Sequence, residues 1–182
     1  MEDQKSLPEH WQRGPVDGVP PLLQPVAHTL LQAMDEIQKV MENFPLILLW
    51  ERPAGMASPA FHVQHIAGVL DRLFTYADNK QLSIEQMQYL KAEGKQDNNI
   101  TIEFLSTYLK NQVINSIEHL KNTDQNTLTE FRGVGRKQLP STVIGLLFHA
   151  AEHTMRHTGQ LIVTVNVLKG GLINRNDHGT DI

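Results

Sequence analysis

The chain has 182 residues, no cysteine and a formal net charge of −4 at pH 7, from 16 Lys and Arg against 20 Asp and Glu. Its length suits a single domain that buries a core of its own. The lack of cysteine excludes a disulfide framework, a zinc finger and a catalytic thiolate supplied by the chain. Neither sign of charge gathers in a long block, so nucleic acid is not expected as a partner.

The amino-terminal sequence and the hydropathy pattern predict a cytoplasmic protein. The first residues, MEDQKSLPEHWQRG, have no apolar run behind their charges and do not resemble a secretory signal. The longest apolar stretches are interrupted before they reach the roughly 20 residues that a transmembrane helix needs. We therefore expect no membrane partner.

Three segments are expected along the chain. Residues 1–21 are rich in proline and glycine, so they are expected to be extended and to wrap on the domain. Residues 22–170 carry the pattern of a single helical bundle. The sequence GGLINRNDHGTDI then leads into a loose carboxyl-terminal tail at 171–182.

Two long helices are predicted in the first half of the chain. Apolar residues recur at helical spacing over 25–44, and Pro45 breaks the pattern. The second helix is expected over 58–77, with Ser58 as its N-cap. Its apolar residues at helical spacing, with His65 on the arc between the first two, are Phe61, Val69, Leu73 and Tyr76.

Two more long helices are predicted in the second half, after a polar connection. The connection carries a short helix that starts after Ser83 and stops near Gly94. The third long helix is expected over 100–121, and the fourth from Pro140 to about Lys169. Four long helices and no convincing strand predict an all-α fold, a four-helix bundle with a short extra helix between helices two and three.

A histidine stripe on the last helix is the strongest functional signal. His149, His153 and His157 are four residues apart, which places neighbours about 40° apart around the helix and about 6 Å apart along it. The outer two are about 12 Å apart, so one ion can take His149 with His153, or His153 with His157. The third ligand must come from another helix, and His65 is the best placed because an unpaired imidazole in an apolar helix is costly.

Three histidines and a water would form the open kind of metal site that catalytic zinc enzymes use. Neutral imidazole also suits nickel, copper and iron. The alternative is that these residues are surface histidines or hydrogen-bonded core histidines, which are common in helices. Other metal motifs are excluded, because neither His149 nor His153 is followed by the glutamate of the zincin motif, and neither Glu118 nor Glu152 begins a Glu-x-x-His pair.

Two segments resemble the DinB/YfiT-like superfamily of four-helix metalloenzymes: FHVQHIAGVLDRL at 61–73 and HAAEHTMRHTGQL at 149–161. In that family one histidine on the second helix, and two on the last helix just before a Gly-Gln pair, bind a divalent metal. The resemblance implies that His65, His153 and His157 are the ligands, with zinc or nickel as the metal.

The resemblance leaves supporting roles for other residues near the motif. It implies that His149 and Gln160 line the pocket or support the ligands. His62 is either a supporting histidine or an exposed one. The Arg-Gly-Gln version of the family motif is Thr-Gly-Gln here, which does not touch the implied ligands.

Three other polar residues near the motif are expected to take no direct part. Asp71 lies about 120° from His65 around the helix, so a surface salt bridge is expected around Asp71 and Arg72. Glu152 precedes an implied ligand and by its angle leaves the metal face.

The resemblance implies a hydrolase or a thiol-dependent S-transferase, in which the metal activates water or a small thiol such as bacillithiol, mycothiol or glutathione. The absence of cysteine is compatible with an external thiol. A small-molecule substrate and a homodimer are expected. One alternative is a non-catalytic metal-binding or stress-response bundle in which the ion pins helices two and four together. The other is a metal-free bundle with a pH-sensitive histidine core.

Overall fold

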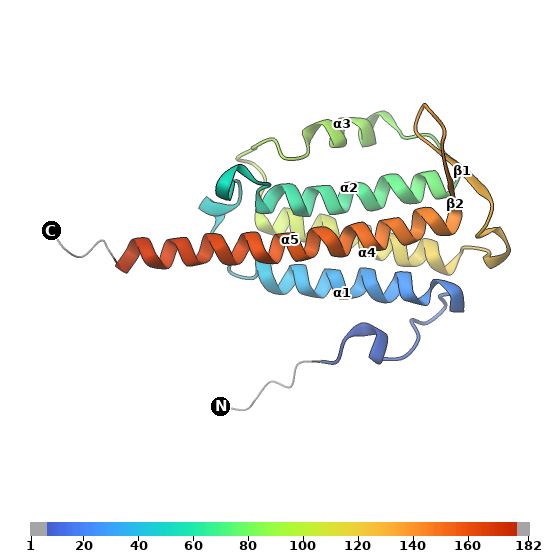
Figure 1. Cartoon of the computed structure of the whole chain (residues 1–182), viewed down its shortest axis with the longest axis horizontal. Coiled ribbons are helices and arrows are strands. Elements are labelled where there is room, and N and C mark those ends of the chain that lie inside the picture. The colour runs from blue at the N-terminus through green and yellow to red at the C-terminus, as the bar shows by residue number, and fades with distance from the viewer. Residues whose placement is uncertain (1–6, 178–182) are drawn as a thin grey trace.

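The computed structural model describes residues 7–177. Its four long helices are α1 (Gln24–Met41), α2 (Pro59–Ala77), α4 (Ile102–Lys121) and α5 (Val143–Asp177). Each of α1 and α2 packs against both α4 and α5, so the four helices form one bundle (Figure 1). The short helix α3 (Ile84–Ala92) lies along the outside of α2. This arrangement confirms the predicted four-helix bundle and its extra helix.

The helix starts follow from capping residues in the sequence. The hydroxyl of Ser58 accepts a hydrogen bond from the backbone N–H of Phe61, and the hydroxyl of Thr101 does the same for Phe104. Ser83 and Gln86 form a reciprocal capping box at the start of α3. Such caps satisfy backbone donors that have no partner inside the helix, and they confirm Ser58 and Ser83 as helix starts.

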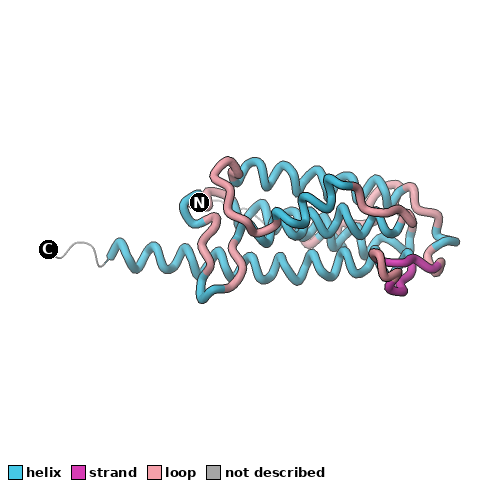
Figure 2. Tube along the Cα trace, turned by 90° about the horizontal axis from the view of Figure 1, so that it is seen from above, coloured by secondary structure: helices cyan, strands magenta, loops and turns pink. Residues whose placement is uncertain are grey.

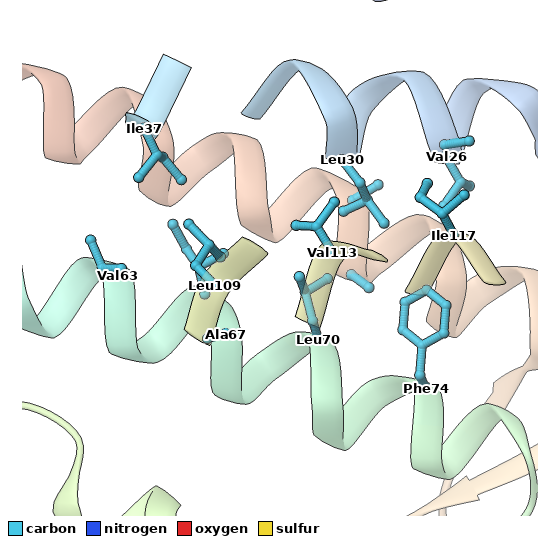
Figure 3. Close-up of a cluster of buried hydrophobic side chains, with 14 of the residues drawn as sticks. Val26, Leu30, Ile37, Val63, Ala67, Leu70, Phe74, Leu109, Val113 and Ile117 are labelled. Carbon is cyan, nitrogen blue, oxygen red and sulfur yellow. The ribbon is translucent and has the colours of Figure 1, made fainter. Parts of the chain in front are cut away.

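The hydrophobic core fills the space between the long helices, as the cluster of apolar side chains in Figure 3 shows. On α4 the apolar residues that recur at helical spacing from Leu105 onward are buried, among them Leu105, Leu109 and Val113. On α2 the buried face differs from the predicted stripe. Large apolar side chains on its buried face are Val63, Ile66, Leu70 and Phe74.

The predicted α2 stripe is shifted because α2 is enclosed by α3, α4 and α5. A helix covered on several sides is apolar nearly all round and has no single buried stripe. Phe61, Leu73 and Tyr76 are therefore only partly buried, at the edge of the core. His65 lies on this edge and not in the apolar interior.

The structure adds a β-hairpin where the sequence predicted only a connection. Strands β1 (Phe131–Val134) and β2 (Leu139–Thr142) pair antiparallel at the end of the bundle where α5 begins (Figure 2). Pro140, expected at the start of the last helix, lies in β2, and α5 begins at Val143. Strands of four residues are too short to show a period in the sequence.

Helix α5 is longer than predicted at its other end. It continues past Lys169 through Gly170 and Gly171 to Asp177, and it extends beyond the other helices of the bundle (Figure 1). The expected helix end at Lys169 is therefore wrong, and residues 178–182 lie outside the described part. Glycine lowers helix propensity by about 1 kcal/mol, which weakens a helix without necessarily ending it.

Three short 3-10 turns lie in the connections after α1 and α4: Leu46–Leu48, Pro53–Gly55 and Gln125–Thr127. Two more, His10–Gln12 and Pro21–Leu23, belong to the segment before α1. This segment is held along α1 by a contact of 2.8 Å between His10 Nε2 and Asp35 Oδ2. Within residues 7–177, no helix has the combination of length and apolar character that a membrane span requires.

Candidate metal centre

The packing of α2 against α5 brings three of the predicted histidines together. His65, on α2, faces His153 and His157, on α5, and one ring nitrogen from each residue lies within 4.8 Å of the other two. His65 Nε2 and His153 Nε2 are 2.9 Å apart. The ring centroid of His157 is 4.6 Å from that of His65 and 4.6 Å from that of His153.

This geometry suits a divalent metal ion. Two imidazole nitrogens bound to one ion at about 2.1 Å are separated by about 3.0 to 3.4 Å, depending on the angle between the bonds. The 2.9 Å between His65 Nε2 and His153 Nε2 is close to that range. Three uncharged nitrogen donors form the set that zinc and nickel accept. The three histidines therefore fit a metal site.

The electrostatics of the cluster keep two of its imidazoles, those of His153 and His157, in the form that binds metal. Burial, together with the neighbouring histidines, lowers the pKa of His157 to about 4. Burial also lowers the pKa of His153, with a further contribution from His65. These two imidazoles are therefore neutral at pH 7, and a neutral imidazole has a free nitrogen lone pair for a metal.

His62 is a buried neighbour of the cluster. Its side chain is only 4% exposed, and its Nδ1 lies 3.1 Å from Nδ1 of His157. Burial, with a contribution from His65, lowers its pKa to about 4. Of the two alternatives for His62, the exposed residue is therefore wrong, and a supporting role stays a prediction. When Nδ1 of His157 is the donor in its contact with His62, the lone pair of its Nε2 is free to bind a metal.

The other two predicted neighbours lie on the surface. The side chain of His149 is 53% exposed, and its ring centroid is 5.3 Å from that of His153. Gln160 is exposed and makes no side-chain hydrogen bond to the described residues. The geometry places His149 at the rim of the cluster, and the pocket roles of His149 and Gln160 stay predictions.

A buried carboxylate beside the cluster was not predicted from the sequence. Glu93 comes directly after α3 as its C-cap; its side chain is 4% exposed, and its Oε2 lies 2.7 Å from Nδ1 of His65. Its Oε1 lies 2.5 Å from Nη1 of Arg72, which is also buried. The expectation of a surface salt bridge around Arg72 is therefore wrong. Glu93 follows His65 by 28 residues in a polar segment, so no periodic pattern links the two.

Glu152 pairs with Arg156 on α5. It accepts a hydrogen bond from Arg156, one turn along the exposed side of α5, at 2.9 Å from the arginine Nε. This bond lowers the pKa of the Glu152 carboxyl below its usual value.

The aromatic neighbour of the site is Phe61, whose ring stacks on His65 with 5.1 Å between centroids.

The fold and the site define a four-helix bundle in which two helices present three histidines to one point, where they could hold a metal ion. The model of the DinB superfamily matches residues 29–161, which contain all three histidines and most of the chain. The chain therefore belongs to the DinB superfamily, and the predicted resemblance is confirmed.

The fold is also similar to that of a solved structure, a conserved protein from Enterococcus faecalis. The two chains are 20% identical, with a TM-score of 0.65 over 82% of this chain and 98% of that one. At this identity the likeness concerns the fold alone. No curated protein matches the chain.

Proposed function

We infer that this protein is a metal-dependent enzyme, a hydrolase or a thiol-dependent S-transferase, with zinc or nickel held by His65, His153 and His157. The observation that carries the proposal is the convergence of three ring nitrogens from α2 and α5 within 4.8 Å. When bound, a divalent ion lowers the pKa of a coordinated water or thiol so that it is deprotonated near neutral pH.

The residues around the cluster support a reactive site. Three protein ligands leave coordination positions open for water or substrate, whereas structural zinc sites use four. The side chain of His65 is 20% exposed, so the cluster is partly open to solvent. The exposed rim contains His149 and Arg156, which can contact a polar substrate. The chain has no cysteine, so an attacking sulfur has to come from a small thiol.

Metal analysis of the purified protein tests the metal site. The wild-type protein is expected to bind one zinc or nickel ion per chain, and the His153→Ala variant to lose most of that affinity. His28→Ala is a matched control, because His28 lies on α1 and contacts the backbone oxygen of Gly14 instead of the cluster. A wild-type protein that carries no ion and takes up none on titration would overturn the proposal.

A panel of nucleophiles tests the reaction class. Bacillithiol, mycothiol and glutathione are offered in turn with the electrophile monochlorobimane, and ester hydrolysis is measured in parallel. Turnover by the metal-loaded wild type that is absent in His153→Ala supports catalysis. Four protein ligands and no turnover with any member of the panel would instead identify a structural metal site.

A further inference from the structure

Glu93, next to the outer helix α3, contacts two residues of α2, one of which is the histidine His65 of the cluster. One carboxylate oxygen lies 2.7 Å from Nδ1 of His65, and the other lies 2.5 Å from Nη1 of Arg72. Both oxygens are therefore engaged, and the Glu93 side chain is 4% exposed. By contrast, Nδ1 of His153 is buried with no hydrogen-bond partner among residues 7–177. Of these two ligands, only His65 has an anionic partner.

The contact with Glu93 determines which nitrogen of His65 is free. An ionised carboxylate only accepts hydrogen bonds, so the proton of a neutral His65 has to lie on Nδ1. The lone pair then lies on Nε2, the nitrogen that is 2.9 Å from Nε2 of His153. This is the tautomer that a metal ligand at this position requires.

Arg72 supplies the charge that this arrangement needs. A carboxylate that is 4% exposed is costly unless a cation and hydrogen bonds compensate the loss of water. Arg72 lies on the same helix as His65, seven residues and about two turns further along. The pair therefore fixes the carboxylate relative to the helix that carries the ligand.

Gly68 provides the space for the Glu93–Arg72 pair. A Cβ atom at position 68 would lie 2.3 Å from Oε1 of Glu93, 2.6 Å from Nη1 of Arg72 and 2.9 Å from Cε1 of Tyr89. Glycine inside a helix costs about 1 kcal/mol relative to alanine, so its presence here needs a packing reason. The carboxylate and the guanidinium group supply that reason.

The backbone around Glu93 is held by Gln64 of α2. The hydroxyl of Tyr89 donates to the backbone oxygen of Gln64 at 3.1 Å, and the N–H of Gly94 donates to its Oε1 at 2.9 Å. Burial raises the pKa of the Tyr89 hydroxyl, which keeps it protonated and able to donate. Polar contacts on both sides of Glu93 therefore fix its position.

We propose that Glu93 is a positioning residue, which with Arg72 and Gly68 holds His65 in the tautomer and orientation that bind the metal. The proposal rests on the metal site inferred above. On this proposal, α3 positions the carboxylate that hydrogen-bonds to the metal ligand His65.

Nitrogen-15 NMR of the metal-free protein tests the proposal directly. In the wild type, His65 is expected to carry its proton on Nδ1, and in Glu93→Ala to redistribute it toward Nε2. Gly68→Ala is expected to shift the tautomer in the same direction without a change of charge, and it keeps the test available if Glu93→Ala does not fold. Glu85→Gln, an exposed carboxylate on the same helix, is the control that leaves the tautomer unchanged.

Zinc titration against a competing chelator gives the second readout. Loss of an outer hydrogen-bond partner weakens metal binding by roughly 10- to 100-fold, and this loss is expected for Glu93→Ala but not for Glu85→Gln. A wild-type His65 protonated on Nε2, or a folded Glu93→Ala with unchanged zinc affinity, overturns the proposal. The tautomer is measured without metal, so failure of the metal site and failure of the positioning role are distinguishable.

Discussion

The histidines of this protein differ in role although they share one residue type. His65, His153 and His157 converge on one point, His62 is buried behind them, and His149 is exposed at the rim. Helical spacing predicts that two of the three stripe members can share an ion, but spacing alone leaves the choice of pair open. The choice depends on where α2 places His65, which is a matter of tertiary packing.

The exposure of His149 leads to a direct comparison within the stripe. His149→Ala is expected to leave zinc affinity within about twofold. His157→Ala is expected to lose more than the roughly 10- to 100-fold that removal of an outer partner causes. Isothermal titration of the two variants measures both values. An equal loss in both variants would show that the ion is shared along the whole stripe.

Buried His62 makes the stability of the metal-free protein depend on pH. Its pKa is about 4 when folded and near the ordinary value of 6.5 when unfolded, so between these values the unfolded chain binds more protons. The contribution of His62 to the unfolding free energy is therefore full above pH 6.5 and falls as the pH drops toward 4, by about 3 kcal/mol.

Urea unfolding with a chelator present, at pH 7, 5.5 and 4.5, measures this dependence. The decrease is expected to be smaller in His62→Leu, which has no titrating group at this position. His157 has a similarly low pKa, so part of the decrease remains in the variant. An identical pH dependence in the two proteins contradicts the assignment.

At the scale of elements, the sequence predicts what is periodic or capped. The four long helices and the start of α3 follow from apolar spacing and from Ser58 and Ser83. The hairpin was not predicted because its strands have only four residues each. The end of α5 was predicted too early because a glycine pair resembles a helix stop. Glu93 was missed for a different reason, since its partner is set by how α3 packs on α2.

Helix α3 is expected to open separately from the bundle. No side chain within Ile84–Ala92 is buried, the buried Glu93 comes directly after the helix, and polar contacts hold α3 to α2. Loss of the cap in Ser83→Ala is expected to destabilise α3 by about 1 kcal/mol. The rate of amide hydrogen exchange over residues 84–92 then increases, while the exchange rate in the core of α4 stays the same. A uniform increase across the bundle would show that α3 folds as one unit with it.

At the scale of the whole molecule, the proposed ion links α2 to α5, which meet at the site and share the hydrophobic core. A ligand that binds only the folded state stabilises it, by about 2.7 kcal/mol at a concentration 100 times its Kd. For a chain of this size that corresponds to a rise in Tm of roughly 5–10 °C. Calorimetry of the metal-free and zinc-loaded protein measures the difference, and His153→Ala is expected to show little of it.

X-ray absorption at the metal edge of the zinc-loaded protein tests the central claim most directly, because it detects the ligands themselves. The wild type is expected to show three imidazole nitrogens together with at least one oxygen donor, and His153→Ala to show fewer imidazoles. A zinc shell without imidazole, or one that is the same in both proteins, would contradict a metal centre built from His65, His153 and His157.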